Sequence, residues 1–339
     1  MPCAVILTAL PVEYLAVRRH LVELEERMHP QGTIYEQGKF VANGQEWEVG
    51  IAEVGAGNAG TAVEAERAIA YFQPNILLFV GIAGGIQDVA IGDVVVATNV
   101  YRYESGKVGE QFFLRSNVGK SAYALVQRAK FEARTRKWLQ RLSSTSVPPP
   151  RVFVAPIIAG EKVVSSRNSD IFQFLRSNYN DAIAIEMEGF GFLSVAFAYP
   201  HIRAIIIRGI SDLIEGKHDD AIESEEVRQA KASHHASAFA FEMLSKLEIT
   251  SRNLRESHQE TKVSATNFQQ KQQLEQRQET LQIECNLTSE KLKQLEWALV
   301  IESEPAVKFQ LKQQIQDEQK QLIKLENDLD EIERFLWSN

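Results

Sequence analysis

The stretch "FVGIAGGIQDVAIGDVVV", residues 79–96, contains two apolar runs joined by a loop of small residues. Runs rich in Val and Ile that end at Gly, Pro, Asn or Asp are typical of buried strands. The same pattern recurs along the first 250 residues, in "CAVILTAL" (3–10), "EVGIAEVG" (48–55), "RVFVAPIIAG" (151–160), "DAIAIEM" (181–187) and "HIRAIIIRGIS" (201–211). We therefore expect a sheet of mostly buried strands.

Helical patterns separate these strands. The expected helices cover residues 13–26, 58–72, 121–142, 170–177, 189–198 and 225–247. Strands that alternate with helices predict an α/β layered domain.

Composition excludes several classes of protein. The 339 residues are 44% hydrophobic and 24% charged, ample for one sizeable domain or two smaller ones. A net charge of −8 argues against a general nucleic-acid-binding surface. Two distant cysteines, Cys3 and Cys285, argue against a disulfide framework and a zinc site, and fit a reducing cytoplasm.

No targeting or membrane segment is expected. The apolar N-terminus lacks a basic leader and is interrupted by Pro11, so it predicts a core strand and not a signal peptide. No run approaches the roughly 18 apolar residues of a membrane span. The sequence therefore predicts a cytoplasmic protein that binds neither membrane nor nucleic acid.

The composition changes near residue 250, so we expect two domains, residues 1–248 and 249–339. The second is rich in Gln, Glu, Lys and Leu and has a single proline, Pro305. Apolar residues at heptad spacing follow that proline: Leu311, Ile315, Leu322, Leu325, Leu329, Ile332 and Leu336. A weaker stripe precedes it: Leu274, Leu281, Cys285, Leu292, Leu295 and Leu299. We expect a helical hairpin with a corner at Pro305 that packs on another copy or on a partner; a solvated tail is the alternative.

Two Gly-rich turns, residues 54–62 and 81–85, follow expected strands and let a ligand approach the backbone. Neither has the dinucleotide-binding spacing, and no G-K-[ST] phosphate loop occurs. No cofactor or metal is therefore expected.

Three acidic residues stand out in otherwise apolar surroundings. Glu186 and Glu188 lie in "AIAIEMEGFGF", residues 182–192, where a buried carboxylate is unfavourable unless it is paired or binds a ligand. We expect Glu186 to pair with Arg208 and to point away from Glu188. Asp212 follows a buried strand, where open α/β sheets bind their ligands, and capping of the next helix is the alternative.

Five motifs, taken in order, resemble one family. They are "ILTALPVEYLAV" (6–17), "VGAGNAGTA" (54–62), "VGIAGG" with "IGDVVV" (80–96), "IAIEMEGFG" (183–191) and "IRGISD" (207–212). Over about residues 3–248 the chain resembles the nucleoside phosphorylase/nucleosidase superfamily, nearest to its methylthioadenosine/S-adenosylhomocysteine nucleosidase branch. The resemblance implies a three-layer α/β/α domain around a mixed, partly barrel-like sheet.

The resemblance also implies roles for single residues. Glu188 would accept hydrogen bonds from the ribose 2′ and 3′ hydroxyls, and Met187 would pack under the sugar. Asp212 would protonate the purine at N7, and Glu13 would orient and deprotonate an attacking water. Further substrate contacts are expected at Ala9, Ile82, Ala83, Gly84, Val163, Val164 and Ser211. The alternatives are a first-turn helix carboxylate for Glu13 and a structural ion pair for Glu188.

Hydrolysis is favoured over phosphorolysis. Phe79 and Ile82 stand where the hexameric phosphorylases of the superfamily carry the Arg and the Ser or Thr that hold phosphate. Apolar side chains cannot stabilise a dianion. We therefore expect water as the nucleophile.

The sequence departs from the family at "AGEKVV", residues 159–164, where the base-stacking aromatic is missing. Lys162 there, and Lys217 with His218 after Asp212, would suit a substrate that carries phosphate; lysines facing solvent are the alternative. The segment also resembles nucleosidase domains fused to signalling ATPases in immunity proteins, and residues 298–315 resemble effector-associated helical modules.

Three hypotheses follow. The first is a purine nucleosidase that acts as a signalling or defence effector, whose residues 250–339 bind a partner or set a homo-oligomer. The second is a housekeeping methylthioadenosine/S-adenosylhomocysteine nucleosidase, with a phosphorolytic purine nucleoside phosphorylase as a less favoured variant. The third is an inactive nucleoside-binding sensor.

Overall fold

A computed structural model describes residues 1–109, 112–115, 117–142, 148–164, 166–214, 223–248, 281, 285, 288–289, 291–293, 295, 299 and 305–337. The chain divides into two compact units, Met1–Thr250 and Ser251–Asn339, and each is described by itself. Among the described helices, none is long and apolar enough to cross a membrane.

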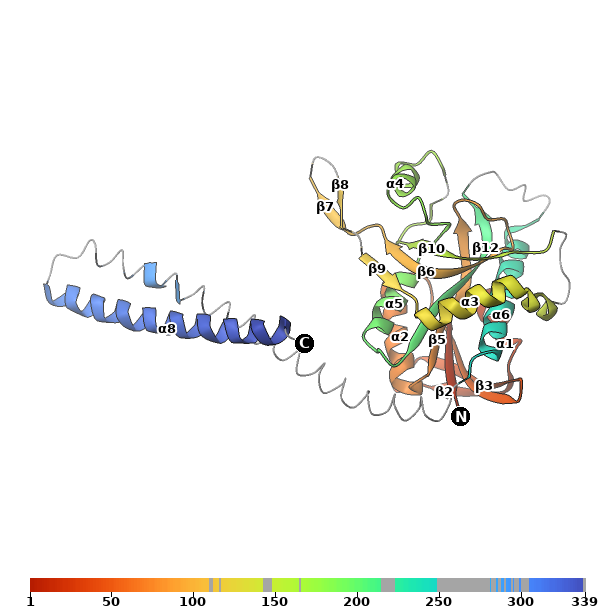
Figure 1. Ribbon diagram of the computed structural model, residues 1–339, viewed down its shortest axis with the longest axis horizontal. Coiled ribbons are helices and arrows are strands. Elements are labelled where there is room, and N and C mark those ends of the chain that lie inside the picture. The colour runs from red at the N-terminus through yellow and green to blue at the C-terminus, as the bar shows by residue number, and fades with distance from the viewer. Residues whose placement is uncertain are drawn as a thin grey trace. The chain divides into compact units, whose positions relative to one another are not determined.

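The first unit contains all of the described strands (Figure 1). They are β1 (Cys3–Thr8), β2 (Val22–Met28), β3 (Ile34–Ala42), β4 (Gln45–Glu53), β5 (Ile76–Gly85), β6 (Val94–Arg102), β7 (Gly106–Val108), β8 (Phe112–Leu114), β9 (Asn117–Lys120), β10 (Val152–Ala159), β11 (Ala184–Glu186) and β12 (Arg203–Leu213). Its helices are α1 (Pro11–Arg18), α2 (Asn58–Phe72), α3 (Tyr123–Thr135), the 3₁₀ helix η1 (Lys137–Arg141), α4 (Asp170–Asn178), α5 (Gly189–Phe197) and α6 (Glu225–Ser245).

The main sheet is mixed and partly closed. Its strand order is β11-β10-β6-β12-β5-β1-β4-β3-β2, and β9 pairs with β6. β11 also pairs with β5, so β5, β12, β6, β10 and β11 form a closed ring. The mixed, partly barrel-like sheet that the resemblance implied is confirmed.

Helices cover both faces of this sheet. Along β1, alternate side chains enter two different cores. Ala4 and Ile6 pack with side chains of α1, α3 and α6, whereas Val5 and Leu7 pack with side chains of α2 and α5. The same division is visible in Figure 1, where α2 and α5 lie together, apart from α1, α3 and α6. The domain therefore has the expected three α/β/α layers.

One expected helix is wrong in its second half. The helix expected over residues 13–26 ends at Arg18, and Val22–Met28 forms β2. This strand pairs with β3 alone and is mostly exposed. Charged side chains on an edge strand oppose edge-to-edge association, and their number in "VELEERM" made the segment look helical. The strand β3 is a further element that the sequence analysis missed.

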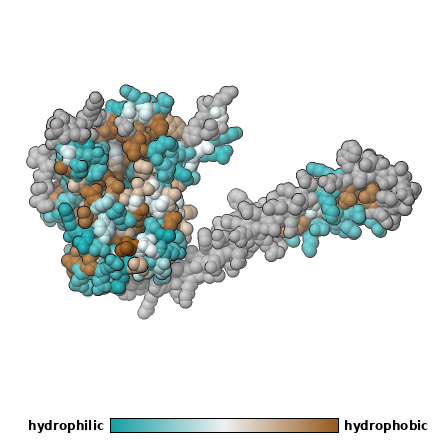
Figure 2. All heavy atoms as spheres, turned by 180° about the vertical axis from the view of Figure 1, so that it is seen from behind, coloured by the Kyte–Doolittle hydropathy of each residue, from teal (hydrophilic) through white to brown (hydrophobic). Residues whose placement is uncertain are grey.

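The surface of the first unit carries scattered apolar side chains. On the face shown in Figure 2, hydrophobic and hydrophilic residues are interspersed. Among the large hydrophobic side chains whose exposure the structure describes, Phe197 at the end of α5, Tyr123 at the start of α3 and Val163 after β10 are the most exposed, at 89%, 78% and 81%.

The second unit includes the long helix α8 (Pro305–Trp337). Ile315 of α8 is buried, as are Leu281, Cys285 and Leu292 of the preceding stripe, whereas Leu322, Leu325 and Leu329 are half-buried. An ion pair between Lys291 and Glu318 joins the two stretches. The corner before Pro305 and Leu274 lie outside the described residues.

Candidate active site

The candidate site lies where β1, β5 and β12 end. β1 is followed directly by Ala9, Leu10 and α1. Pairing between β12 and β5 places Gly209 beside Ile82 and Asp212 beside Gly84, with an irregularity in register between Ile210 and Asp212. Because parallel strands end at the same edge, side chains far apart in sequence converge here.

Glu13 is held by the backbone of two segments. Its Oε2 accepts hydrogen bonds from the N–H of Ala9 (2.7 Å) and Leu10 (2.9 Å), and its Oε1 accepts one from Ile82 (2.8 Å). Its side chain is buried, with only 2% of the residue exposed. A carboxylate offers about four acceptor positions, so one remains for a ligand. The N–H groups of Ala9 and Ile82, two of the predicted substrate contacts, therefore hold the Glu13 carboxylate in place.

Arg208 joins the two glutamates of the E-M-E segment. It is fully buried, and its Nη2 forms ion pairs with Glu186 and, at 3.0 Å, with Glu188. Its guanidinium stacks on the ring of Phe79, with Cζ 4.5 Å from the ring centroid. The expected pair between Glu186 and Arg208 is present, but Arg208 contacts both carboxylates.

The expectation that Glu186 points away from Glu188 is wrong. Side chains two residues apart in a strand point to the same side. In addition, β11 ends at Glu186, and α5 begins at Gly189. Glu186 accepts hydrogen bonds from the N–H of Glu188 (3.1 Å) and of Gly189 (2.8 Å). It thus satisfies N–H groups at the start of α5 that have no partner within the helix.

Three carboxylates lie near one guanidinium in this buried region, and the pKa values of Glu13 and Glu186 are shifted. Burial raises the pKa of Glu13, against the lowering effects of Arg208 and the three backbone N–H groups. Burial also raises the pKa of Glu186 to about 7, against the positive charge of Arg208. Burial alone would lower the pKa of Arg208, but Glu186, Glu188 and Glu13 together raise it. The site thus holds a permanent cation and at least one carboxyl that titrates near neutral pH.

Gly81 allows Glu13 and Arg208 to approach each other. A Cβ on Gly81 would lie 2.6 Å from Glu13 Oε1 and would overlap the Arg208 guanidinium. Arg208 Nη1, on this side, has no hydrogen-bond partner among the described residues, and neither has Nε. A buried donor without a partner is unfavourable, so an acceptor placed between Nη1 and Glu13 would be stabilising.

Asp212 is the most exposed of the predicted catalytic groups, with 42% of its side chain accessible. Its Oδ1 accepts a hydrogen bond from Arg228 Nη2 (3.1 Å) and its Oδ2 one from the Ser211 hydroxyl (2.8 Å). It does not cap a helix, because it lies within β12. Asp212 is therefore accessible to a ligand, and Ser211 orients it.

Glu188 keeps acceptor positions free. Its Oε1 accepts a hydrogen bond from the N–H of Gly57 (3.1 Å), and its Oε2 accepts the one from Arg208. About two of its four acceptor positions therefore remain. Met187, half-buried, lies directly before it.

The remaining predicted contacts differ in exposure. Ala83 is buried and Gly84 half-buried in β5. Val163 is largely exposed, whereas Val164 packs against a core cluster. Lys162 forms an ion pair with Glu104, so its charge is partly neutralised. Lys217 and His218 lie outside the described residues.

The contacts made by the turn before α2 were not predicted from the sequence. Gly57 donates to Glu188, and Asn58 contacts both the segment after β10 and the first turn of α5. The Gly-rich motif "VGAGNAGTA" indicated close approach to the backbone, but not that the neighbouring group would be Glu188.

A family model described as the Phosphorylase superfamily matches residues 4–245. The chain belongs to this superfamily. The match covers more than two thirds of the sequence and includes every catalytic residue predicted above. The resemblance on which those predictions rest is therefore confirmed, whereas their individual roles stay predictions.

Members of the superfamily with curated names include nucleosidases. The 5′-methylthioadenosine/S-adenosylhomocysteine nucleosidase of Maridesulfovibrio salexigens is 24% identical over 187 residues, which are 55% of this chain and 77% of that protein. The ATP nucleosidase Cap17 of Escherichia coli is 26% identical over 66% of this chain and 48% of its own length. The chain thus spans about half of Cap17.

Solved structures of the superfamily share the fold. The 5′-methylthioadenosine/S-adenosylhomocysteine nucleosidase of Helicobacter pylori has a TM-score of 0.58 and 22% identity, over 73% of this chain and 99% of its own. Futalosine hydrolase of the same organism also has a TM-score of 0.58, with 21% identity over 73% of this chain and all of its own. At this identity the likeness shows the fold alone.

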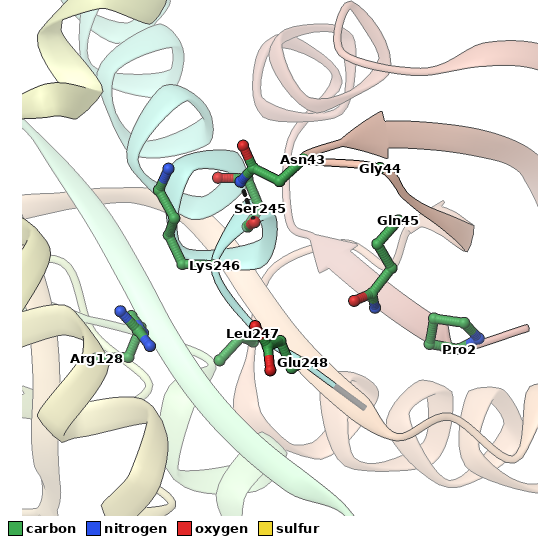
Figure 3. A pocket seen from close by; sticks show the side chains of 9 residues that line it. All are labelled: Pro2, Asn43, Gly44, Gln45, Arg128, Ser245, Lys246, Leu247 and Glu248. Carbon is green, nitrogen blue, oxygen red and sulfur yellow. Dashed lines mark hydrogen bonds between the residues drawn. The ribbon is translucent and has the colours of Figure 1, made fainter. Parts of the chain in front are cut away.

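A cavity elsewhere in this superfamily member is separate from the site. It measures about 720 Å³ and is lined by Pro2, Asn43, Gly44, Gln45, Arg128, Ser245, Lys246, Leu247 and Glu248 (Figure 3). Pro2 precedes β1, whereas Glu13 lies beyond its other end. A hydrogen bond from Asn43 to the Ser245 carbonyl (2.7 Å) crosses its wall. Described residues hold no group of three or more His, Cys, Asp or Glu arranged for a metal ion.

Proposed function

We propose that this chain hydrolyses the N-glycosidic bond of a purine nucleoside or nucleotide. The observation that carries the proposal is the buried group formed by Glu13, Glu188 and Arg208, with Asp212 at the adjacent strand end. Its relatives named nucleosidases support the same reaction class.

Glu13 and Arg208 suit the activation of water. A water that donates to the free acceptor position of Glu13 Oε1 and accepts from Arg208 Nη1 satisfies both groups. As the water oxygen bonds to C1′ of the sugar, its proton passes to Glu13. A general base is most effective when its pKa lies near the working pH, and burial moves the pKa of Glu13 in that direction.

Asp212 is suited to interact with the purine base of the substrate, and Glu188 with its ribose. When the C1′–N9 bond breaks, its electron pair stays on the purine, and a proton delivered by Asp212 to N7 neutralises the leaving base. Glu188 accepts hydrogen bonds from the ribose hydroxyls through its free acceptor positions. Its negative charge also stabilises the positive charge that develops on the sugar.

The charges of the site favour water over phosphate as nucleophile. Glu186 and Glu188 form ion pairs with a single guanidinium, Glu13 lies near it, and the ring of Phe79 stacks against it. A phosphate dianion placed beside Glu13 and Glu188 would be repelled, whereas a neutral water is not. A phosphorolytic reaction is therefore disfavoured.

We expect product formation without phosphate. Purified protein incubated singly with methylthioadenosine, S-adenosylhomocysteine, adenosine, AMP and ATP should release free base and ribose, or its 5′-modified form, from at least one of them. Chromatography of the products, with and without added phosphate, measures this. Formation of a ribose 1-phosphate would contradict hydrolysis, and the absence of any cleavage would leave an inactive sensor as the better hypothesis.

The relatives favour two different classes of substrate. Similarity to Cap17, named an ATP nucleosidase, favours a nucleotide. Similarity to several 5′-methylthioadenosine/S-adenosylhomocysteine nucleosidases favours a thioether nucleoside without phosphate. The pairing of Lys162 with Glu104 weakens one predicted phosphate contact. An effector role in signalling or defence stays a prediction from the sequence.

We also propose that residues 249–339 form an association module beside the catalytic domain, 1–248. Three leucines of α8, Leu322, Leu325 and Leu329, remain half-buried, so part of the heptad stripe is left for another copy or a protein partner. The catalytic residues all lie before residue 248.

A charge in this stripe should reduce assembly. Leu322→Glu with Leu329→Glu places two carboxylates into the half-buried stripe, at a cost of several kcal/mol if the stripe is buried by association. We expect a lower mass in size-exclusion light scattering with nucleosidase activity retained. Ile323→Glu, at a neighbouring position that is 58% exposed, is the matched control and should keep the wild-type mass. An unchanged mass in the double variant would mean that α8 does not set the oligomer.

A further inference from the structure

The side chain of Asn58 connects three segments around Glu188. Asn58 is buried at the first position of α2. Its Nδ2 donates to Glu161 Oε1 (3.0 Å), in the segment after β10, and its Oδ1 accepts from the N–H of Gly191 (2.9 Å), in the first turn of α5. A single amide thus fixes the start of two helices and the end of one strand.

The segments joined by Asn58 are closely packed and anchored by further hydrogen bonds. A Cβ on Gly191 would overlap the carbonyl of Asn58, so the two helices touch through backbone. A Cβ on Gly57 would lie 3.4 Å from Glu161 Oε2, so Glu161 packs over the turn that precedes α2. The N–H of Gly160 bonds to the Glu186 carbonyl (3.2 Å), and the N–H of Glu161 bonds to Glu104 (3.0 Å). The segment that presents Glu161 is therefore itself anchored.

The turn held in this way orients Glu188. Its Oε1 bonds to the N–H of Gly57, directly before Asn58, while its Oε2 bonds to Arg208. Two fixed donors on two different oxygens set the rotation of the carboxylate. If the Gly57 turn moves, only the bond to Arg208 remains, and that bond alone does not define the plane of the carboxylate.

We propose that Asn58 and Glu161 are positioning residues: they hold the Gly57 N–H so that the Glu188 carboxylate faces the sugar hydroxyls. The inference rests on the proposed function, because it assumes that Glu188 binds ribose. Neither residue touches the substrate in this role. Glu161 acts as a hydrogen-bond acceptor and not through its charge, because its partner is a neutral amide.

The test compares a ribo substrate with its 2′-deoxy counterpart, using whichever of methylthioadenosine, S-adenosylhomocysteine, adenosine, AMP or ATP the wild type cleaves. Asn58→Ala and Glu161→Ala should each lower kcat/KM on the ribo substrate by about tenfold, which corresponds to one hydrogen bond. The loss on the 2′-deoxy substrate should be smaller, since one of the two hydroxyls is missing. Glu161→Gln keeps an oxygen acceptor for Asn58 and should stay within about twofold of wild type.

Three controls separate positioning from stability. Glu188→Gln should change the ratio of ribo to 2′-deoxy activity in the same direction, by roughly 10 to 100 fold on the ribo substrate for one charge-assisted bond. Glu64→Ala removes an ion pair with Arg67 elsewhere on α2 and should leave the ratio unchanged. The double variant of Asn58→Ala with Glu161→Ala should lose no more than either alone, because both act through one bond.

Three results would contradict the positioning role of Asn58 and Glu161. An unchanged ribo to 2′-deoxy ratio in both alanine variants, with a changed ratio in Glu188→Gln, would overturn the positioning role while leaving the proposed function intact. A loss in Glu161→Gln equal to that in Glu161→Ala would show that the charge of Glu161 matters, which contradicts the role assigned here. If the wild type cleaves none of the five substrates, the proposed function fails and the positioning role fails with it.

Discussion

Asp212→Asn should lower turnover by about 10² to 10⁴ fold while the protein stays folded, since this is the usual contribution of general acid catalysis. The amide has nearly the shape of the carboxyl, and its oxygen can still accept from Arg228 or Ser211, which bond to the carboxylate in the structure. What it lacks is a proton that it can give to N7 of the leaving purine. Steady-state kinetics on the cleaved substrate, with thermal unfolding as the check on folding, measure the effect.

A substrate that needs no acid gives the sharpest control. A riboside with a nitrophenolate leaving group departs without protonation, so the loss in Asp212→Asn should be much smaller on it than on a purine. Asp181→Asn changes an exposed carboxylate that bonds to Tyr101 and should have little effect. Full purine-cleaving activity in Asp212→Asn would remove Asp212 from the mechanism, and equal losses on both substrates would assign it a role in folding or binding.

The sequence predicts local structure well where the turn residues and the spacing of the apolar residues indicate the same helix or strand bounds. The helix expected at residues 58–72 matches α2 in both bounds, because Gly57 adopts a positive φ of 107° before it and Gln73 a left-handed conformation after it. The edge strand β2 was mistaken for helix because its charged residues suit both structures. Which of them forms is decided by pairing with β3, a contact outside the segment.

In the candidate site, too, single residues could be predicted from local sequence, whereas contacts between distant segments could not. Glu13, Glu188 and Asp212 could be chosen from motifs, and a single charge in "AIIIRGIS" predicted that Arg208 pairs with Glu186. The convergence of Glu186, Glu188 and Glu13 on Arg208 could not be predicted. It depends on the closure of the strand ring through β11 and β5 and on the turn at Gly57, which lies more than 120 residues away from Glu188 in the chain.

Glu13→Gln should also lower turnover by about 10² to 10⁴ fold, because an amide cannot take the proton of the attacking water. The substitution places an NH₂ group among the N–H donors of Ala9, Leu10 and Ile82, so folding must be checked by thermal unfolding. Glu26→Gln, on the exposed strand β2, is the matched control. Wild-type turnover in Glu13→Gln would exclude Glu13 as the base.

The pH profile tests the base independently of the size of that loss. Burial raises the pKa of Glu13, so the carboxylate that accepts the proton disappears as the pH falls through this raised value. We expect kcat/KM of the wild type to decline on the acid side at a pH above the ordinary Glu pKa of about 4.3. Since Gln does not titrate, the residual activity of Glu13→Gln should lack this part of the decline. Glu186, with its pKa raised to about 7, contributes a second titration in the same range, so Glu186→Gln serves as the comparison. An acid-side decline that persists unchanged in Glu13→Gln but vanishes in Glu186→Gln would assign the titration to Glu186, and water activation would then have to be sought elsewhere in the site.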